Sequence, residues 1–274
     1  MRLAGVRKMT GSGFSTRRSS RGHTLLELTI AVALGLVVGA GAITAYRSQH
    51  QAFVAATDAA RIHEAGMNAL LLIGEQIQMA GFTPADTPQG PAASAIFGCT
   101  AGRPVGADAG LTCETLSSRS DGIAIRYVGD TVSTSRSSSG EVTDCLGQAA
   151  GGEGVTVVNR YHAKPSSSTG EPELYCEGSG KVGTAQPLVE GVEKLRLRYW
   201  LADASQPVDA SSLARDQWPQ VIAVDLCVQV RGAPSTRRVS YVDCNGATIL
   251  ATDGRARQIF WRHIALRNAA GGAA

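Results

Sequence analysis

The sequence is constrained most by an apolar run near its N-terminus that contains a single acidic residue. From His23 to Tyr46 there is no Lys, Arg or Asp, and the only carboxylate is that of Glu27. Within a membrane an acid costs roughly 2.5–3.5 kcal/mol on insertion scales, so Glu27 indicates a functional residue that needs a partner. Six basic residues and no acidic residue precede the run, in a leader that ends at Gly22.

Two simpler interpretations of this region are a secretory signal and a plain single-pass anchor. A secretory signal would combine the basic leader and the apolar run with a small-residue cleavage site at 40–42, Ala-Gly-Ala. For an anchor, the uncharged run at 28–45 has 18 residues, close to the lower limit for spanning about 30 Å of hydrocarbon. Neither interpretation explains a glycine at the charge boundary with a glutamate five positions later.

Gly22 and Glu27 together resemble the prepilin signature of type IV pilins and pseudopilins. The resemblance implies that a prepilin peptidase cuts between Gly22 and His23 and that the new N-terminus at His23 is methylated. It also implies that Glu27 is the fifth residue of the mature chain. His23 departs from the family pattern, which usually has phenylalanine at this position.

The charge of the leader predicts the orientation of the chain in the membrane. Six of the 26 basic residues lie in 1–22, so the remaining chain has 20 basic against 23 acidic residues. A basic segment before an apolar run holds the N-terminus in the cytoplasm by the positive-inside rule. We therefore expect a single-pass inner-membrane protein with a periplasmic C-terminal domain.

All six cysteines follow the apolar run: Cys99, Cys113, Cys145, Cys176, Cys227 and Cys244. An even number of cysteines in an exported chain, with no CxxC pair among them, favours disulfides over a metal site. Six cysteines allow 15 connectivities, and the sequence alone does not choose among them. We predict nearest-neighbour pairing, because Cys227 and Cys244 end two strand-like runs that could form one hairpin.

The helix is predicted to continue past the apolar run, from about residue 24 to about 80, with a transmembrane half at 23–46 and an amphipathic half at 47–82. Apolar or small residues recur at spacings of three and four, which is typical of a packed helix face: Phe53, Ala56, Ala60, His63, Met67, Leu70, Gly74 and Ile77. The opposite face carries Asp58, Arg61, Glu64, Asn68 and Glu75. Prolines that follow Gly81 predict the helix end.

Residues 83–274 are expected to form a β-rich domain. The stretch 83–120, rich in Pro, Gly, Ala and Ser, is predicted to be a loop tied by Cys99 and Cys113. Strand-like runs follow at 122–128, 154–161, 194–201, 221–230, 237–243 and 258–266. In the third run apolar and basic residues alternate, as in a half-buried strand. No internal repeat is evident. The pattern predicts an α+β fold whose antiparallel sheet covers the helix stripe.

No catalytic, cofactor or metal site is predicted. The five histidines show no metal-ligand spacing, and G-x-S-x-G, phosphate-loop and HExxH motifs are absent from the sequence. The chain is therefore not expected to be an enzyme. Nucleic-acid binding is also not expected. A basic patch of seven arginines lies between 231 and 267, but solvated strand faces produce the same count: Arg231, Arg237, Arg238, Arg255, Arg257, Arg262 and Arg267.

The apolar helix carries residues suited to assembly. Ala31, Gly35 and Gly39 form a small-xxx-small ridge, which allows helices to approach closely in lipid; the simpler explanation is that Gly and Ala are common in membrane helices. Glu27 is expected to pair with the N-terminal amine of a neighbouring subunit, because pairing offsets the desolvation of both charges. Alternatively, its side chain snorkels to the membrane interface.

Several later segments resemble PilW-type minor pilins: 77–82, 145–147, 174–176, 188–200 and 264–268. The resemblance implies a minor pilin that helps to initiate type IV pilus assembly, at or near the tip of a fibre on the cell surface. Its implied partners are other minor pilins, the major pilin and the inner-membrane assembly platform. A type II secretion pseudopilin is one alternative. A tip adhesin or DNA-uptake receptor is an alternative of another class.

Overall fold

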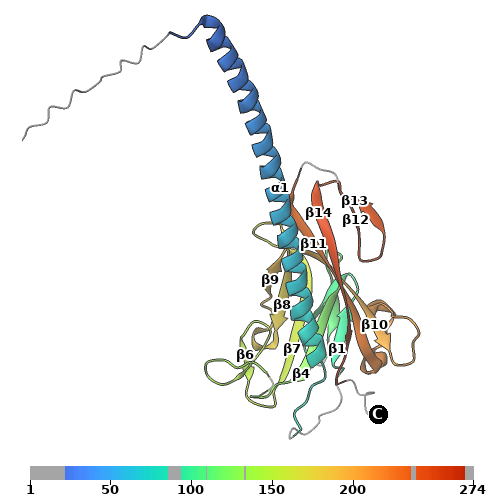
Figure 1. The fold of residues 1–274 in the computed structure, drawn as a ribbon. Helices are drawn as coiled ribbons and strands as arrows, with labels where there is room; N and C mark the ends of the chain where they lie inside the picture. Colours follow the sequence, from blue (N-terminus) through green and yellow to red (C-terminus); the bar gives the residue numbers. More distant parts are fainter. Residues whose placement is uncertain (1–21, 86–93, 109, 133, 236–238, 269–274) are drawn as a thin grey trace, which may run out of the picture. The chain divides into compact units, whose positions relative to one another are not determined.

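The computed structural model describes residues 22–85, 94–108, 110–132, 134–235 and 239–268 (Figure 1). Most of the expected leader (1–21) and two residues of the predicted basic patch, Arg237 and Arg238, lie outside these ranges. The chain divides into two compact units, one that ends at Val54 and one that begins at Ala55.

The N-terminal unit is the first part of helix α1, which runs from Leu25 to Met79. These bounds agree with the predicted helix to within one residue at each end. The composition favours the helix, because Leu and Ala are strong helix formers and no proline occurs between Gly22 and Thr83. The large apolar side chains of this unit are exposed, so their burial requires lipid or other helices.

A glycine turn ends α1 at the position that the sequence predicts. Gly81 has a φ of +75°, a conformation that favours glycine. Its backbone N–H donates to the Arg126 carbonyl at 2.9 Å. A Cβ atom at this position would lie 2.9 Å from the backbone oxygen of Asn268. The helix end is therefore attached to a strand and to the C-terminal segment by contacts that need a glycine.

The buried face of α1 differs in part from the predicted stripe. The buried residues are Ile62, Gly66, Ala69, Leu70, Ile73, Gly74 and Ile77. The last three predicted positions are among them, but Phe53 and Met67 are 70% and 49% exposed. The first five predicted positions are therefore wrong. A count in threes and fours from Phe53 reaches His63 and Met67, whereas the neighbouring residues Ile62 and Gly66 are the ones that are buried.

Gly66 allows a close approach between α1 and β14 (Arg255–Ala265). A Cβ atom at Gly66 would lie 2.2 Å from the ring of Phe260. Gly66→Ala is therefore expected to lower the free energy of unfolding by about 1–3 kcal/mol through overpacking, although alanine usually favours a helix. The melting temperature of the full-length protein in detergent should fall by roughly 2–12 °C.

Gly74→Ala is the matched control for this substitution. The nearest atom to a Cβ at Gly74 is the flexible end of the Arg262 side chain, at 3.2 Å. The guanidinium can move, so this variant should unfold close to the wild-type temperature. An equal loss in both variants would contradict a steric role for Gly66.

The larger sheet has five antiparallel strands in the order β1-β4-β7-β8-β9. The strands are β1 (Ile96–Cys99), β4 (Gly122–Val128), β7 (Thr156–Pro165), β8 (Pro172–Gly178) and β9 (Gln186–Glu190). The prediction for β4 is confirmed residue for residue. Strands β8 and β9 were not predicted, because each has a proline at or next to its first residue, which weakens the strand signal.

The smaller sheet has three antiparallel strands in the order β10-β11-β14. Strand β10 spans Val192–Leu201, and β11 spans Val221–Pro234. Two short 3-10 helices, η2 (Ala210–Ser212) and η3 (Arg215–Gln220), lie between them. Leu195, Leu197 and Tyr199 are at most 1% exposed, which confirms the predicted alternation.

The stretch 83–120 is more ordered than predicted. Besides β1 it contains a hairpin of β2 (Gly102–Val105) and β3 (Thr112–Thr115). The expected loop is therefore wrong in part, because four-residue strands that contain Gly and Pro give almost no periodic signal.

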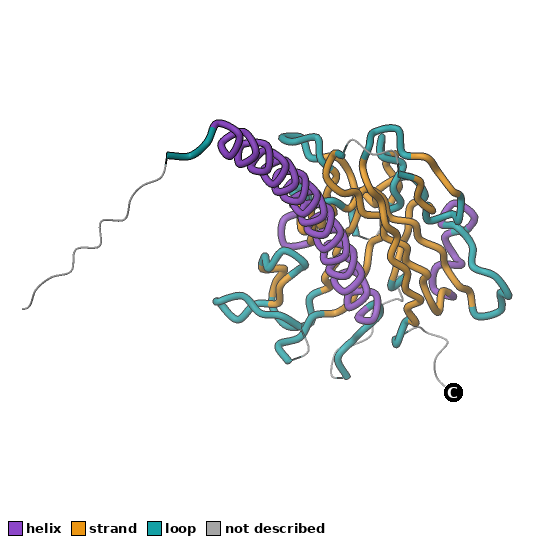
Figure 2. The backbone as a smooth tube through the Cα atoms, turned by 45° about the horizontal axis from the view of Figure 1, so that its top comes forward, coloured by secondary structure: helices purple, strands orange, loops and turns teal. Residues whose placement is uncertain are grey.

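The two sheets and the second half of α1 enclose the core, and Figure 2 shows this part of the helix lying across the strands. Asn159 of β7 donates to the Gln76 side chain of α1 at 2.7 Å. The backbone N–H of Leu197 in β10 donates to the Asp121 carboxylate beside β4 at 2.9 Å. The α+β fold with antiparallel sheets is confirmed.

Three disulfides join Cys99 to Cys113, Cys145 to Cys176 and Cys227 to Cys244. This is the nearest-neighbour pairing expected from the sequence, but the reason given for it was wrong. Cys227 lies in β11, whereas Cys244 follows β12 (Ser240–Val242), which pairs with β13 (Thr248–Leu250). The third disulfide therefore links two different sheets and does not close one hairpin.

Two of the disulfides hold the same small motif, which we term a clasp: a hairpin whose tip has the sequence Asp-Cys-x-Gly. The first clasp joins β5 (Val142–Thr143) to β6 (Ala149–Gly151), and the second joins β12 to β13. They lie on opposite sides of the globular unit in Figure 1. The interpretation that no repeat is present missed this motif, for which the recurring tetrapeptide was the signal.

Candidate functional site

Thr24 begins the helix beside the predicted processing site. Its side-chain oxygen accepts a hydrogen bond from the Glu27 backbone N–H at 3.2 Å. Its carbonyl accepts one from the Leu28 backbone N–H at 3.1 Å. Threonine followed three residues later by glutamate is the sequence of a capping box, and an acid in the first turn favours the helix dipole. Thr24 thus caps the helix, and Glu27 occupies the capping-box position in its first turn, a local signal in the Thr-x-x-Glu spacing that the sequence-based interpretation missed.

The Glu27 carboxylate is accessible to other molecules. Its Oε2 atom lies 3.4 Å from Nδ1 of His23, one helical turn earlier, and the two side chains are 62% and 81% exposed. Gly22 is also exposed. The structure therefore brings the three predicted residues of the N-terminal motif together at the first turn, on an open surface.

The small residues proposed for helix packing lie on the same open half of α1. A Cβ atom built on Gly35 or Gly39 would meet nothing within 4 Å. Ala31, one turn before Gly35, is exposed. Backbones of neighbouring helices can approach closely along such a ridge. Among the described residues, α1 is the one helix long and apolar enough to span a membrane, and none of its most apolar 18-residue window is buried.

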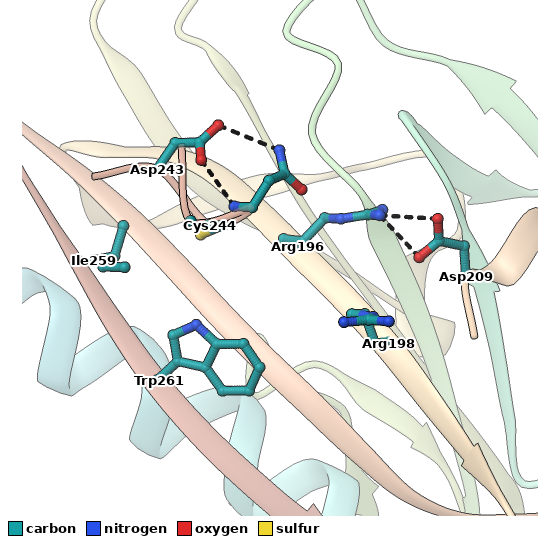
Figure 3. Close-up of a pocket in the computed structure, with 9 residues that line it drawn as sticks. Arg196, Arg198, Asp209, Asp243, Cys244, Ile259 and Trp261 are labelled. Carbon is teal, nitrogen blue, oxygen red and sulfur yellow. Dashed lines mark hydrogen bonds and ion pairs between the residues drawn. The ribbon is translucent and has the colours of Figure 1, made fainter. Parts of the chain in front are cut away.

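A polar cleft lies in the globular unit beside the second clasp (Figure 3). Its volume is about 410 Å³, and its lining includes Arg196, Arg198, Asp209, Asp243, Asn245 and Trp261. Hydrogen bonds of 2.8 and 2.9 Å hold the Arg196 guanidinium against Asp209. Burial alone would raise the pKa of the Asp243 carboxyl, but hydrogen bonds from Ala247 and Asn245 lower it overall. The cleft therefore presents an ionised carboxylate at neutral pH.

The described residues do not form a metal site, since no three His, Cys, Asp or Glu side chains in them are grouped to hold an ion. His63, predicted on the buried stripe, is exposed, and its ring lies 5.7 Å from that of Phe260. His162 is buried, and this burial, together with Arg103 and Lys164, lowers its pKa to about 3. His162 is therefore neutral at physiological pH.

Arginines of the predicted basic patch are paired with acids that lie earlier in the chain. Glu171 forms ion pairs with Arg231 and Arg255 at 3.0 and 2.8 Å. Glu193 pairs with Arg257 at 2.7 Å. Hydrogen bonds from Arg255, with Arg231, lower the pKa of Glu171, so this acid is charged at neutral pH. A count of charges between residues 231 and 267 missed these acids, and these three arginines are not free cations.

Comparisons with known proteins identify two regions of the chain. Residues 160–268 match the family described as Type IV Pilus-assembly protein W, and residues 17–43 match the Prokaryotic N-terminal methylation motif. No curated protein matches the chain. A type IV-like pilin from Thermus thermophilus is a similar solved structure, with 12% identity, a TM-score of 0.44, and coverage of 76% of this chain and 97% of that one.

The region that matches the methylation motif includes the first part of α1, and the region that matches PilW includes strands β8 to β14 and part of β7. The methylation motif implies processing by a prepilin peptidase and a membrane-anchored pilin before assembly. Pilin-family proteins are structural and non-enzymatic. Over residues 160–268 the chain is similar to the PilW family of type IV pilus-assembly proteins, and over residues 17–43 it carries the N-terminal methylation motif of pilins.

Proposed function

We propose that the chain is a minor pilin that helps to initiate type IV pilus assembly and lies at or near the fibre tip. The observation that carries the proposal is the first half of α1, an exposed apolar helix with one carboxylate, Glu27, in its first turn. Such a surface is compatible both with lipid and with a bundle of similar helices. The family match supplies the context of pilus assembly.

The proposed processing and topology follow from the N-terminal motif. The peptidase cuts between Gly22 and His23, and the amine of His23 is methylated. The basic leader stays in the cytoplasm, the helix segment 23–46 spans the inner membrane, and the globular domain is periplasmic until the chain enters the fibre. The partners are other minor pilins, the major pilin and the inner-membrane assembly platform.

The proposed assembly contact is an ion pair between Glu27 and the N-terminal amine of a neighbouring subunit. The support for it is the exposure of the Glu27 carboxylate, which leaves room for a cation from another chain. The ridge of Ala31, Gly35 and Gly39 would bring the two helices close enough for the pair to form. The pair would set the stagger of one subunit against the next.

Mass spectrometry of protein from sheared fibres tests the proposal. The chain should be present there and should begin at an N-methylated His23, because the leader is removed before assembly. A mature protein that begins near Ile43 would indicate cleavage by signal peptidase after the small residues at 40–42 and would contradict the prepilin interpretation.

Deletion of the gene separates the proposed function from that of a secretion pseudopilin. Surface pili should decrease, while enzymes exported by type II secretion should still leave the cell. Normal piliation with those enzymes trapped in the periplasm would instead identify a pseudopilin, which shares the N-terminal motif.

A further inference from the structure

The first clasp holds a turn of its own chain. The Oδ2 atom of Asp144 accepts a hydrogen bond from the Gly180 backbone N–H at 2.9 Å, in the short helix η1 (Ser179–Lys181). A Cβ atom on Gly180 would lie 2.8 Å from the Ala149 carbonyl oxygen and 2.9 Å from Asp144 Oδ2. The first clasp therefore forms a small binding site, which we term its seat. The seat accepts a backbone N–H group through Asp144 Oδ2 and leaves room only for glycine at the contact.

The second clasp repeats the internal geometry of the first. In the first, Asp144 Oδ1 accepts the backbone N–H groups two and four residues later, at 2.9 and 3.0 Å. In the second, Asp243 Oδ1 does the same, at 2.9 Å in both bonds. The final glycine of each tip, Gly147 or Gly246, has a positive φ. The two tips thus aim their second carboxylate oxygen in equivalent ways.

In the part of the chain that the structure describes, no backbone N–H group from another segment occupies the equivalent position at the second clasp. Among the described residues, Asp243 Oδ2 bonds only to the side-chain amide of Asn245 within the same tip, at 3.2 Å. The Asp243 carboxylate lines the cleft (Figure 3). Strand topology explains the difference. Strand β8 ends two residues after Cys176, so the next turn reaches the first clasp, whereas β11 continues seven residues beyond Cys227.

The rest of the cleft suits a peptide. Trp261 is 51% exposed, and Arg198 uses its guanidinium only to reach the Pro207 carbonyl among the described residues, at 3.0 Å. Trp and Arg are, with Tyr, the residue types most enriched at the energetic centres of protein interfaces. A peptide turn offers an N–H group to Asp243, a carbonyl to Arg198 and an apolar surface to Trp261. Nucleic acid is disfavoured, because its phosphates would face Asp209 and Asp243.

We propose that the second clasp receives a glycine-containing turn from a neighbouring pilin subunit, held by Asp243, Arg198 and Trp261. The inference rests on the proposed function, which supplies such neighbours in the fibre. The disulfide between Cys227 and Cys244 ties the clasp to β11, so the seat is formed before the partner arrives. The first clasp thus binds a turn of its own chain, and the second clasp binds a turn of a neighbouring chain through the same Asp-Cys-x-Gly tip.

Photo-crosslinking of the full-length protein in piliated cells tests the inference. p-Benzoylphenylalanine at Ile259, in the cleft, should give a crosslink to a glycine-containing turn of a protein that itself has a prepilin motif. The same group at Val38, on the exposed apolar helix, reports incorporation into the fibre. Asp243→Asn should lower the crosslink yield at 259 by roughly tenfold or more, because a hydrogen bond to a charged acceptor is lost.

Asp144→Asn is the matched control for Asp243→Asn. Both amides keep an oxygen for the N–H groups of the tip and turn an NH2 group toward the seat. Asp144→Asn should lower the melting temperature of the purified protein more than Asp243→Asn does, because the loss of charge within the tip is common to both variants, whereas only Asp144 also holds Gly180. This difference separates loss of a partner contact from misfolding of the clasp.

The outcomes distinguish the inference from the function on which it rests. A crosslink at 38 without one at 259, or an Asp243→Asn yield equal to wild type, overturns the inference and leaves the minor pilin in place. Absence of crosslinks at both positions overturns the proposed function. Binding of purified protein to a saccharide array that is lost in Trp261→Ala, without a protein crosslink at 259, assigns the cleft to a sugar and overturns the inference.

Discussion

Glu27→Ala is expected to give a processed protein that remains in the inner membrane and is absent from sheared fibres. Gly22 and the apolar helix are unchanged, and insertion is favoured when no acid enters the bilayer. Incorporation should fail because a neighbour's N-terminal ammonium loses its partner in an apolar environment, at a cost of about 3–5 kcal/mol. That cost corresponds to a loss of more than about hundredfold in occupancy. Immunoblots of membrane and fibre fractions measure it.

Glu27→Gln separates charge pairing from helix capping. Glutamine at position 27 keeps the backbone N–H that donates to Thr24 and is also a capping-box residue, but it carries no charge. If the carboxylate pairs with an ammonium, the glutamine variant should be missing from fibres like the alanine variant. Normal assembly of the glutamine variant would leave Glu27 only the capping role. Recovery of the alanine variant at wild-type levels would show that the carboxylate snorkels.

Removal of the Cys145–Cys176 disulfide is expected to lower the free energy of unfolding by about 3–4 kcal/mol, the chain-entropy estimate for a loop of this size. The two residues are 31 positions apart. Cys176 is fully buried in the core, and Cys145 packs against the same cluster. For the full-length protein in detergent, the double alanine variant should unfold roughly 6–16 °C below the wild type.

The double alanine variant at Cys227 and Cys244 is the matched control, because these residues are 17 positions apart and Cys227, although buried, does not belong to the main hydrophobic cluster that contains Cys176. Its loss should be about 3 kcal/mol or less. The unmodified protein should show no free thiols after denaturation, and two or more reactive thiols would contradict the disulfide framework. Equal losses in the two double variants would show that packing of Cys176 in the main hydrophobic cluster adds nothing to the effect of loop closure.

The N-terminal site could be predicted from the sequence because its signals are local. The charge boundary at Gly22, the lone acid at Glu27 and the apolar run lie within one stretch of helix, and no distant segment of the described chain competes for them. The cleft could not be predicted in the same way. Arg198, Asp243 and Trp261 come from three separate strands or turns, and only the pairing of β10, β11 and β14 brings them together.

The sequence by itself determined the helix, its end at Gly81, the alternation in β10 and the disulfide-bonded character of the part that follows the helix. Each of these depends on neighbouring residues, whose periodicity and backbone preferences act before any tertiary contact forms. The tertiary structure alone decided which face of α1 is buried, which acids neutralise the arginines, and which clasp has a filled seat. These outcomes depend on contacts between distant segments, and packing of the whole core selects them over the local pattern.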